Sequence, residues 1–217
     1  ALTGKFHHPA SGLLGGSSNL FPKTLGKLTR PDLVPEATRT LNIIDIGRHL
    51  AQDDIEPPLR GIFVYNHNPL IVHPDQNTMR QGLAREDVFT VVADVAMTDT
   101  AAYADVVLPA ASHFEHEDIF CAYGQQFLQR AEPVIEPVGE ALPNTEIFRR
   151  LAHRFGFDDP IFQASDKALI DDAIDADDPR LSGTLASQLP TGTALSMGAP
   201  TDRIGFERVP TTRSGRI

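Results

Sequence analysis

The chain of 217 residues contains a single cysteine, Cys121, and no tryptophan. One thiol excludes an internal disulfide, and it also excludes an iron–sulfur cluster or a cysteine-rich zinc site built by this chain alone. A lone thiol fits a reducing compartment, so we expect the chain to be cytoplasmic.

Positive charge is also scarce. Nineteen Lys and Arg residues face 29 Asp and Glu residues, which gives a formal net charge of -10. Binding to nucleic acid requires a concentration of basic side chains, so we exclude a nucleic-acid partner. No stretch approaches the roughly 18 consecutive apolar residues of a spanning helix, and the amino terminus lacks a signal-peptide pattern. We therefore expect no membrane contact by this segment.

The composition, with 41% hydrophobic and 22% charged residues, is that of an ordinary globular domain. The chain begins with Ala1 rather than Met, and its last residues, Thr212 to Ile217, are a polar run of the kind found in linkers. We interpret the sequence as a piece of a longer protein. The alternative is a complete protein that has been processed or trimmed.

Short apolar runs alternate with amphipathic stretches along the middle of the chain. The runs 61–65, 88–93 and 106–108 read as buried strands, while 76–84 and 145–155 have helical spacing, as do parts of 40–50 and 158–180. Asn144 or Thr145 could cap the helix over 145–155, and Gly156 could end it. The alternation predicts an α/β fold, a doubly wound and mostly parallel Rossmann-like sheet flanked by helices, with irregular terminal segments. We expect one domain over 1–180 and an extended segment or linker over 181–217.

Polar residues follow each predicted strand. Asn66, His67 and Asn68 follow the first, Asp94 follows the second, and the stretch 110–117 follows the third. Ligands of open α/β sheets bind beyond the carboxyl ends of the strands, so these groups should meet in one crevice. There the Asp94 carboxylate could accept two hydrogen bonds from a ribose diol or a guanine. Without a ligand, Asp94 reads as a helix cap and Asn68, which precedes proline, as a turn former.

Two further site types receive less support. His113 and His116, with Glu115 and Glu117, could ligate zinc, but nothing selects a further ligand, and we expect no protein metal site. A free-standing hydrolase that uses His116 and Asp94 would lack a nucleophile motif. The sequence also contains no phosphate-binding loop, HExxH motif or GxGxxG turn.

Three segments together resemble the molybdopterin oxidoreductase family of DMSO reductases, formate dehydrogenases and nitrate reductases. They are Asn68-Pro69 at a strand end, the motif from Phe89 to Asp118, and the stretch from Pro137 to Gly156. The opening "ALTGKFHHPASGLLGG" and the closing "VPTTRSGRI" resemble the family's entry into its third domain and its exit from it. The chain is thus similar to that third domain alone.

The resemblance implies molybdenum bound by two molybdopterin guanine dinucleotides, one of them held by this domain. The cofactor-binding residues that it implies are Asn68, Ala93, Asp94, His116 and Asn144, with Asp94 at the nucleotide end. His116 stands where some relatives carry Lys, and Asn144 where several carry Asp. Thr98, Thr100 and Asp105 match motif positions that we expect to shape the loop and cap the neighbouring helix.

The residues that ligate molybdenum and iron–sulfur clusters in the family have no counterpart here, and Cys121 is not a substitute. We therefore expect an isolated chain that is inactive and retains little cofactor. Its implied partners are the remaining domains of the parent enzyme, with an iron–sulfur domain or electron-transfer partner among them, and the periplasm is a second location open to that parent. The alternative is a non-enzymatic nucleotide-binding module or scaffold protein.

Overall fold

The computed structural model describes residues 20–121 and 125–198. They form two compact units interleaved along the chain. The unit that we call the α/β unit comprises 28–118 and 132–166, and the second unit comprises 20–27, 119–121, 125–131 and 167–198. The expected division between 1–180 and 181–217 stays a prediction, and the segments that resemble a domain entry and exit lie outside the described residues.

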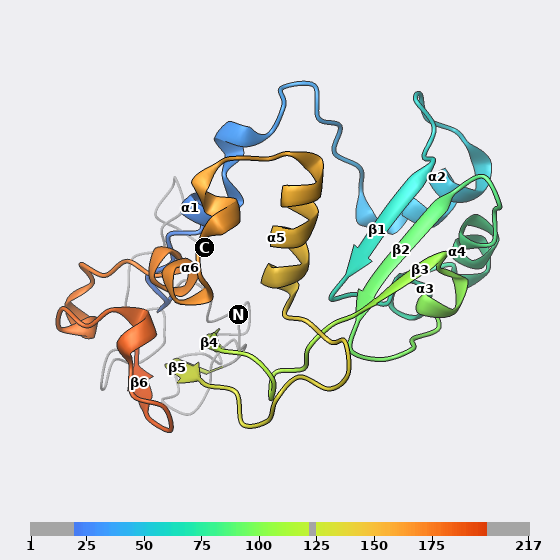
Figure 1. Ribbon diagram of the computed structural model, residues 1–217. Helices are drawn as coiled ribbons and strands as arrows, with labels where there is room; N and C mark the ends of the chain where they lie inside the picture. The colour runs from blue at the N-terminus through green and yellow to red at the C-terminus, as the bar shows by residue number, and fades with distance from the viewer. Residues whose placement is uncertain (1–19, 122–124, 199–217) are drawn as a thin grey trace, which may run out of the picture. The chain divides into compact units, whose positions relative to one another are not determined.

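A parallel three-stranded sheet is the frame of the α/β unit (Figure 1). Its strands β1 (Gly61–Tyr65), β2 (Phe89–Asp94) and β3 (Val106–Pro109) lie in the order β1-β2-β3. Each strand agrees within one residue with a run that the sequence marks as buried and apolar. Tyr65 pairs with Ala93, and Asp94 pairs with Pro109, so the three strands end at one edge of the sheet.

Helices cover both faces of this sheet, as the α/β prediction requires. On one face α2 (Ile46–Gln52), α3 (Pro69–Val72) and α4 (Gln76–Leu83) enclose an apolar core. On the other face α5 (Asn144–Phe155) places the ring of Phe148 5.7 Å from that of Phe63 and 4.9 Å from that of Tyr65. Short 3-10 helices lie at Pro31–Leu33, Ile43–Asp45, Ala101–Tyr103 and Pro160–Gln163. The sheet is thus the middle layer of three.

The close packing of α2 against α4 depends on glycine. A Cβ placed on Gly82 would lie 2.6 Å from the Cβ of the fully buried Leu50, which is closer than real carbon atoms approach. Glycine at this position therefore sets the separation of the two helices.

The helix α5 matches its predicted extent but not its predicted cap. It begins at Asn144, directly after Pro143, and no side chain caps its first turn, so the expected cap by Asn144 or Thr145 is wrong. It ends at Gly156, whose φ of 76° lies in the left-handed region that the sequence predicted for a terminal glycine. Asn144 is therefore free of the capping role.

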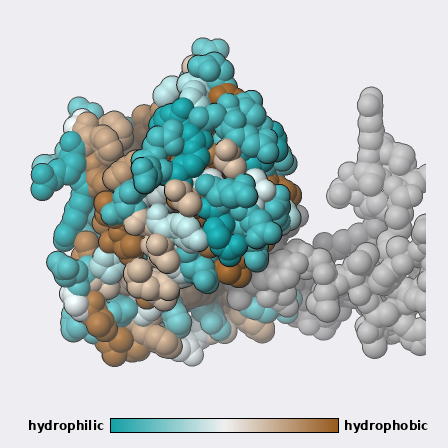
Figure 2. All heavy atoms as spheres, turned by 90° about the vertical axis from the view of Figure 1, so that its right-hand side faces the viewer, coloured by the Kyte–Doolittle hydropathy of each residue, from teal (hydrophilic) through white to brown (hydrophobic). Residues whose placement is uncertain are grey.

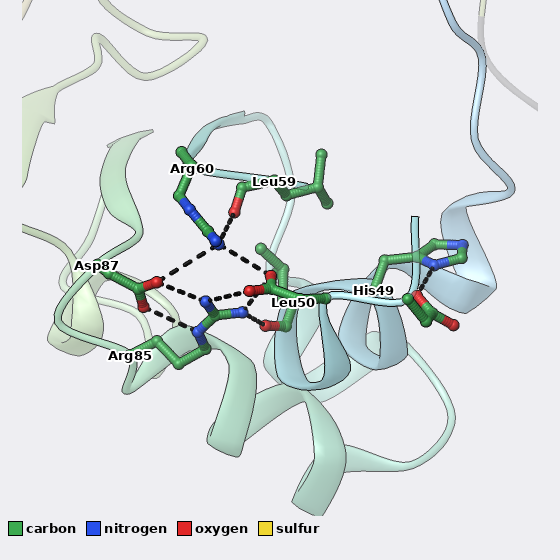
Figure 3. Close-up of polar contacts among 8 residues, drawn as sticks. His49, Leu50, Leu59, Arg60, Arg85 and Asp87 are labelled. Atoms are coloured by element: carbon green, nitrogen blue, oxygen red, sulfur yellow. Dashed lines mark hydrogen bonds and ion pairs between the residues drawn. The ribbon is translucent and has the colours of Figure 1, made fainter. Parts of the chain in front are cut away.

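Ion pairs close the edge at which the strands of the sheet begin. Arg85 donates to Asp53 (2.6 and 2.9 Å), to Asp87 (2.6 and 2.9 Å) and to the backbone carbonyl of Leu50 (2.5 Å). Arg60 donates to Asp53 at 2.9 Å. Figure 3 shows both guanidinium groups between the end of α2 and Asp87. Hydrogen bonds from Arg85, and for Asp53 also from Arg60, hold the pKa of both carboxyl groups below its usual range.

The second unit holds a small sheet that the sequence analysis did not predict. Its strands β4 (Asp118–Cys121), β5 (Phe127–Ala131) and β6 (Ala194–Ser196) lie in the order β4-β5-β6, with β5 and β6 antiparallel. Helix α1 (Gly26–Thr29) begins in the second unit and ends in the α/β unit, and helix α6 (Asp166–Ala173) begins at the last residue of the α/β unit. The core of the second unit is formed by Phe21, Leu128, Ile170, Ile174, Leu181, Leu189 and Met197.

Exposed apolar side chains gather where the strands of the α/β unit end. In Figure 2, hydrophobic spheres are visible along the lower rim, the end toward which the strands of Figure 1 point. Four such side chains lie in the segments that leave β1 and β2: Ile71 (47% exposed), Val72 (60%), Val95 (63%) and Met97 (71%). Across residues 20–121 and 125–198, no helix has the length and apolar character needed to cross a membrane.

Candidate functional site

The predicted site residues lie around the carboxyl edge of the sheet, where β1, β2 and β3 end. Asn66 and Asp94 directly follow the paired residues Tyr65 and Ala93, so the segments that leave β1 and β2 start side by side. Neighbouring strands are about 4.8 Å apart, which brings the two segments within reach of one small ligand. We call this edge, with the loops that leave it, the carboxyl edge.

Asn68 is held in place by Thr100. The Oγ1 of the fully buried Thr100 donates to Asn68 Oδ1 at 2.6 Å and accepts from the backbone NH of Leu70 at 3.1 Å. The Nδ2 donor of Asn68 has no partner within the described part of the chain. The bond to Thr100 therefore fixes the amide so that its acceptor is used and its donor is available. The expected loop-shaping role of Thr100 is thus seen as a direct contact with a candidate ligand-binding residue.

Asp94 is half-buried at the end of β2 and caps no helix. Its Oδ1 accepts a hydrogen bond from the backbone NH of Val95 at 2.7 Å, while Oδ2 has no partner among residues 20–121 and 125–198. Ala93, before it, is buried between β1 and β3 and contributes only a methyl group. The chemistry of this dipeptide therefore resides in one free carboxylate oxygen.

Asn144 reaches the carboxyl edge from α5. Its Nδ2 donates to Asn66 Oδ1 at 2.7 Å, and Asn66 has a left-handed backbone with φ of 52°. The Oδ1 of Asn144 is buried and has no hydrogen-bond partner. A buried acceptor without a donor costs free energy, of the order of 1–3 kcal/mol. The structure thus leaves an unsatisfied acceptor at the position that the resemblance assigns to the cofactor.

Among residues 20–121 and 125–198, His116 contacts Ser112 in the loop after β3 and Asp118 at the start of β4. Its Nδ1 lies 2.8 Å from the backbone oxygen of Ser112, and its Nε2 lies 3.7 Å from a carboxylate oxygen of Asp118. These contacts orient the imidazole within the segment after β3, and no contact within the described part of the chain joins it to Asn68, Asp94 or Asn144. Of the predicted residues it is the one for which the structure gives the least support.

Glu115, which the sequence offered as a metal ligand, has a different role. Its buried carboxylate accepts hydrogen bonds from the backbone NH of Ser112 (2.7 Å) and of Val138 (2.6 Å). The hydrogen bonds from Ser112, and then that from Val138, lower the pKa of Glu115. The described residues contain no group of three or more His, Cys, Asp or Glu side chains that could hold a metal ion.

A second segment anchors the loop after β3. Ala110 and Leu142 form a parallel bridge, and Ala111 donates its NH to the oxygen of Leu142 at 2.8 Å. This pairing continues the line of β3 and delivers the chain to the start of α5. It explains how Asn144, 50 residues after Asp94 in sequence, comes to the same edge of the sheet.

Besides the bond from Thr100 to Asn68, two interactions at this edge were not predicted. One is the bond between Asn66 and Asn144, and the other is a contact of 2.7 Å between the Nε2 atoms of His67 and His73. Both join residues whose spacing follows no regular period of a helix or strand. In the sequence, the polar cluster Asn66-His67-Asn68 indicates where these contacts lie, but it does not indicate which residues form them.

Known proteins are similar to this chain over the segments that carry these residues. The family model of molybdopterin oxidoreductases matches residues 39–154, just over half of the chain. The "Probable oxidoreductase YoaE" of Bacillus subtilis is 45% identical over 184 residues, which cover 84% of this chain and 27% of that protein. The "Probable oxidoreductase YyaE" of the same organism is 34% identical over 155 residues, which cover 67% of this chain and 22% of that protein.

A solved structure supports the assignment. Acetylene hydratase from Pelobacter acetylenicus superposes with a TM-score of 0.53 at 30% identity, over 62% of this chain and 18% of the hydratase. The chain thus spans about a quarter of the length of its curated relatives. The family model covers both β1 and β2, the loops that carry Asn68 and Asp94, and nearly all of α5. The chain belongs to the molybdopterin oxidoreductase family.

Proposed function

We propose that this chain holds one molybdopterin guanine dinucleotide at its carboxyl edge, as the cofactor-binding domain of a larger, bis-dinucleotide oxidoreductase. The observation that carries the proposal is the convergence of Asn68, Asp94 and Asn144 on that edge, each with one polar atom that the described protein leaves unpaired. The molybdenum carried by the bound cofactor supplies the redox chemistry of the parent enzyme.

The free polar atoms fit a guanine base. Guanine presents ring and exocyclic N–H donors beside a carbonyl acceptor, so its recognition requires protein acceptors together with a donor. Asp94 Oδ2 and Asn144 Oδ1 are acceptors, and Asn68 Nδ2 is a donor. Asp94, as the only charged member, contributes most because charge-assisted hydrogen bonds are the strongest of the three.

The chain's own residues bind and orient but do not react. The three groups proposed for binding offer hydrogen bonds only, so we propose that the isolated chain is inactive and retains its cofactor weakly. The partners proposed for it are the remaining domains of the parent, which would cover the exposed apolar rim at Ile71, Val72, Val95 and Met97. We propose a cytoplasmic location for the parent.

The proposal is tested by titrating the chain with GMP in a calorimeter. The substitution Asp94→Ala should weaken binding by about 1–3 kcal/mol, because it removes a charge-assisted pair. The matched control is Asp158→Asn, which changes an exposed carboxylate of the same unit away from the sheet. An affinity that is the same in wild type and Asp94→Ala would remove Asp94 from the site. Absence of GMP binding by the wild type would contradict the proposed function itself.

A further inference from the structure

Two histidines enclose the loop that carries Asn68. His67 precedes Asn68 and His73 follows α3, and their Nε2 atoms are 2.7 Å apart, with ring centroids 4.8 Å apart. A neutral imidazole has one donor and one acceptor nitrogen, so this bond requires one Nε2 that carries a proton and one that does not. The bond closes the chain from residue 67 to residue 73 across α3.

The enclosed segment cannot hold its own shape. The helix α3 has four residues, and a helix of that length is unstable unless other parts of the protein fix it. The backbone carbonyl of Asn68 accepts hydrogen bonds from the backbone NH groups of Ile71 and Val72 at 3.1 Å each, so the position of Asn68 depends on the helix. Hydrogen bonds from this segment to Thr100 fix Asn68 and Leu70, and the contact between His67 and His73 connects the two ends of the segment.

We propose that His67 and His73 are positioning residues for Asn68: their shared hydrogen bond holds the Asn68 loop in its ligand-binding form, and acidification opens it. This inference rests on the proposed function only in naming what the loop binds. The opening of the loop itself is a property of the protein without ligand.

A single added proton leaves one donor and one acceptor and keeps the hydrogen bond, but a second proton opens the pair for two reasons. Once both imidazoles are charged, two N–H donors and two positive charges face each other at a distance that suits only a donor and an acceptor. In addition, the Nδ1 of His73 is buried without a partner, so an imidazolium there would carry a buried N–H that no acceptor meets.

The carboxylate nearest to His73 in sequence is already engaged. The helix α3 has no titratable side chain, and the carboxylate of Asp75 is engaged by the hydroxyl of Thr78 (2.6 Å) and its backbone NH (3.2 Å). Burial first, and the neighbouring His67 second, lower the pKa of His73 below 6.5. Since the folded state disfavours a proton on His73, the stabilisation by its neutral form is complete above the ordinary pKa of histidine, and it is lost as the pH falls from there through the lowered pKa of the folded state.

A double variant separates the hydrogen bond from its titration. In His67→Gln/His73→Gln the two side-chain amides can replace the Nε2 contact, and neither gains a proton between pH 7.5 and 5.5. His153→Gln, which removes an exposed histidine on α5, is the matched control. Titration with GMP at both pH values measures affinity, and the comparison between variants cancels the titration of the nucleotide phosphate, whose pKa is about 6.

Relative to the double variant, we expect the GMP affinity of the wild type and of His153→Gln to fall about tenfold from pH 7.5 to 5.5. An equal loss in the double variant and the wild type, or no loss in a wild type that binds GMP, would overturn the proposal.

Hydrogen–deuterium exchange of the wild type provides a readout that needs neither ligand nor variant. After correction for intrinsic rates, the amides of Ile71 to His73 should lose at least about tenfold protection at pH 5.5, while those of α5 keep theirs. Unchanged protection of Ile71 to His73 would overturn the proposal even if GMP does not bind. Failure of GMP binding at both pH values, with protection lost as expected, would contradict the proposed function alone.

Discussion

The two edges of the parallel sheet differ in how completely their polar groups are paired. At the edge where the strands begin, Arg85 and Arg60 engage Asp53 and Asp87, and Arg85 also satisfies a carbonyl at the end of α2. At the carboxyl edge, Asp94 and Asn68 each keep an unpaired atom, and Asn144 Oδ1 and His73 Nδ1 are buried without partners. The polar groups of one edge are paired within the described protein, whereas the other edge keeps polar groups without a partner there.

The strongest test of this difference is at Thr100. Replacing Thr100 with Val keeps the shape of the side chain but leaves the NH of Leu70 and the Oδ1 of Asn68 without their partner. We expect a loss of about 1–3 kcal/mol in unfolding free energy, measured by urea denaturation, because the NH of Leu70 loses a buried partner and Asn68 Oδ1 a part-buried one. GMP affinity should fall as well, since Asn68 is no longer oriented. Unaltered affinity would show that Asn68 is not a ligand-binding residue.

The same substitution at Thr90 should have the opposite sign. Thr90 is fully buried in β2, and its Oγ1 has no hydrogen-bond partner. Thr90→Val removes a desolvated hydroxyl and keeps the side-chain volume, so we expect stabilisation by about 1 kcal/mol. GMP affinity should not change, because Thr90 lies within the sheet and not at its carboxyl edge. Destabilisation in the same urea experiment would mean that the hydroxyl has a partner in solution.

The smallest effect is expected at the opposite edge. Arg85→Met should lower the midpoint of thermal unfolding by a few degrees, since exposed ion pairs contribute little, and it should leave GMP affinity unchanged. The pKa values of Asp53 and Asp87 are lowered in the folded state, so this stabilisation is present above their unfolded pKa of about 3.9 and is lost at lower pH. The difference between wild type and variant should therefore shrink between pH 7 and 3. A loss of GMP binding in Arg85→Met would show that the edge at which the strands begin also affects ligand binding, which contradicts the distinction between the two edges.

Local pattern was sufficient for the frame of the α/β unit. The apolar runs at 61–65, 88–93 and 106–108 became β1, β2 and β3 because a parallel sheet covered on both faces requires uninterrupted apolar strands. The helix α5 was predictable because its apolar residues recur at helical spacing and a glycine ends it. The second sheet was missed because its strands have three to five residues and no clear alternation.

The location of the candidate site could be predicted, but its internal contacts could not. Strand ends in a parallel sheet share one edge, so Asn68 and Asp94 follow from topology. The bond from Thr100 to Asn68 spans 32 residues, and that from Asn144 to Asn66 spans 78. Such contacts depend on strand register and on side-chain rotamers, which no local periodicity encodes. His67 and His73 are six residues apart, but their contact requires the turn at Asn68-Pro69.

Family membership leaves the reaction open. The curated relatives YoaE and YyaE are named oxidoreductases, whereas the structural neighbour is a hydratase. The same framework thus serves proteins with differently named activities, as expected when a fold positions a cofactor and other domains choose the substrate. The contribution of this chain, on our proposal, is the part common to all of them.

Glu115 gives the unit one more property. By accepting the NH of Val138, while Phe114 accepts those of Val134 and Ile135, it fastens the outgoing chain to the returning one on either side of residues 119–131. Residues 119–131 are therefore connected to the α/β unit through a junction that involves neither Asp94 nor the start of α5. Lengthening or replacing residues 119–131 should therefore alter the second unit and leave the carboxyl edge as it is.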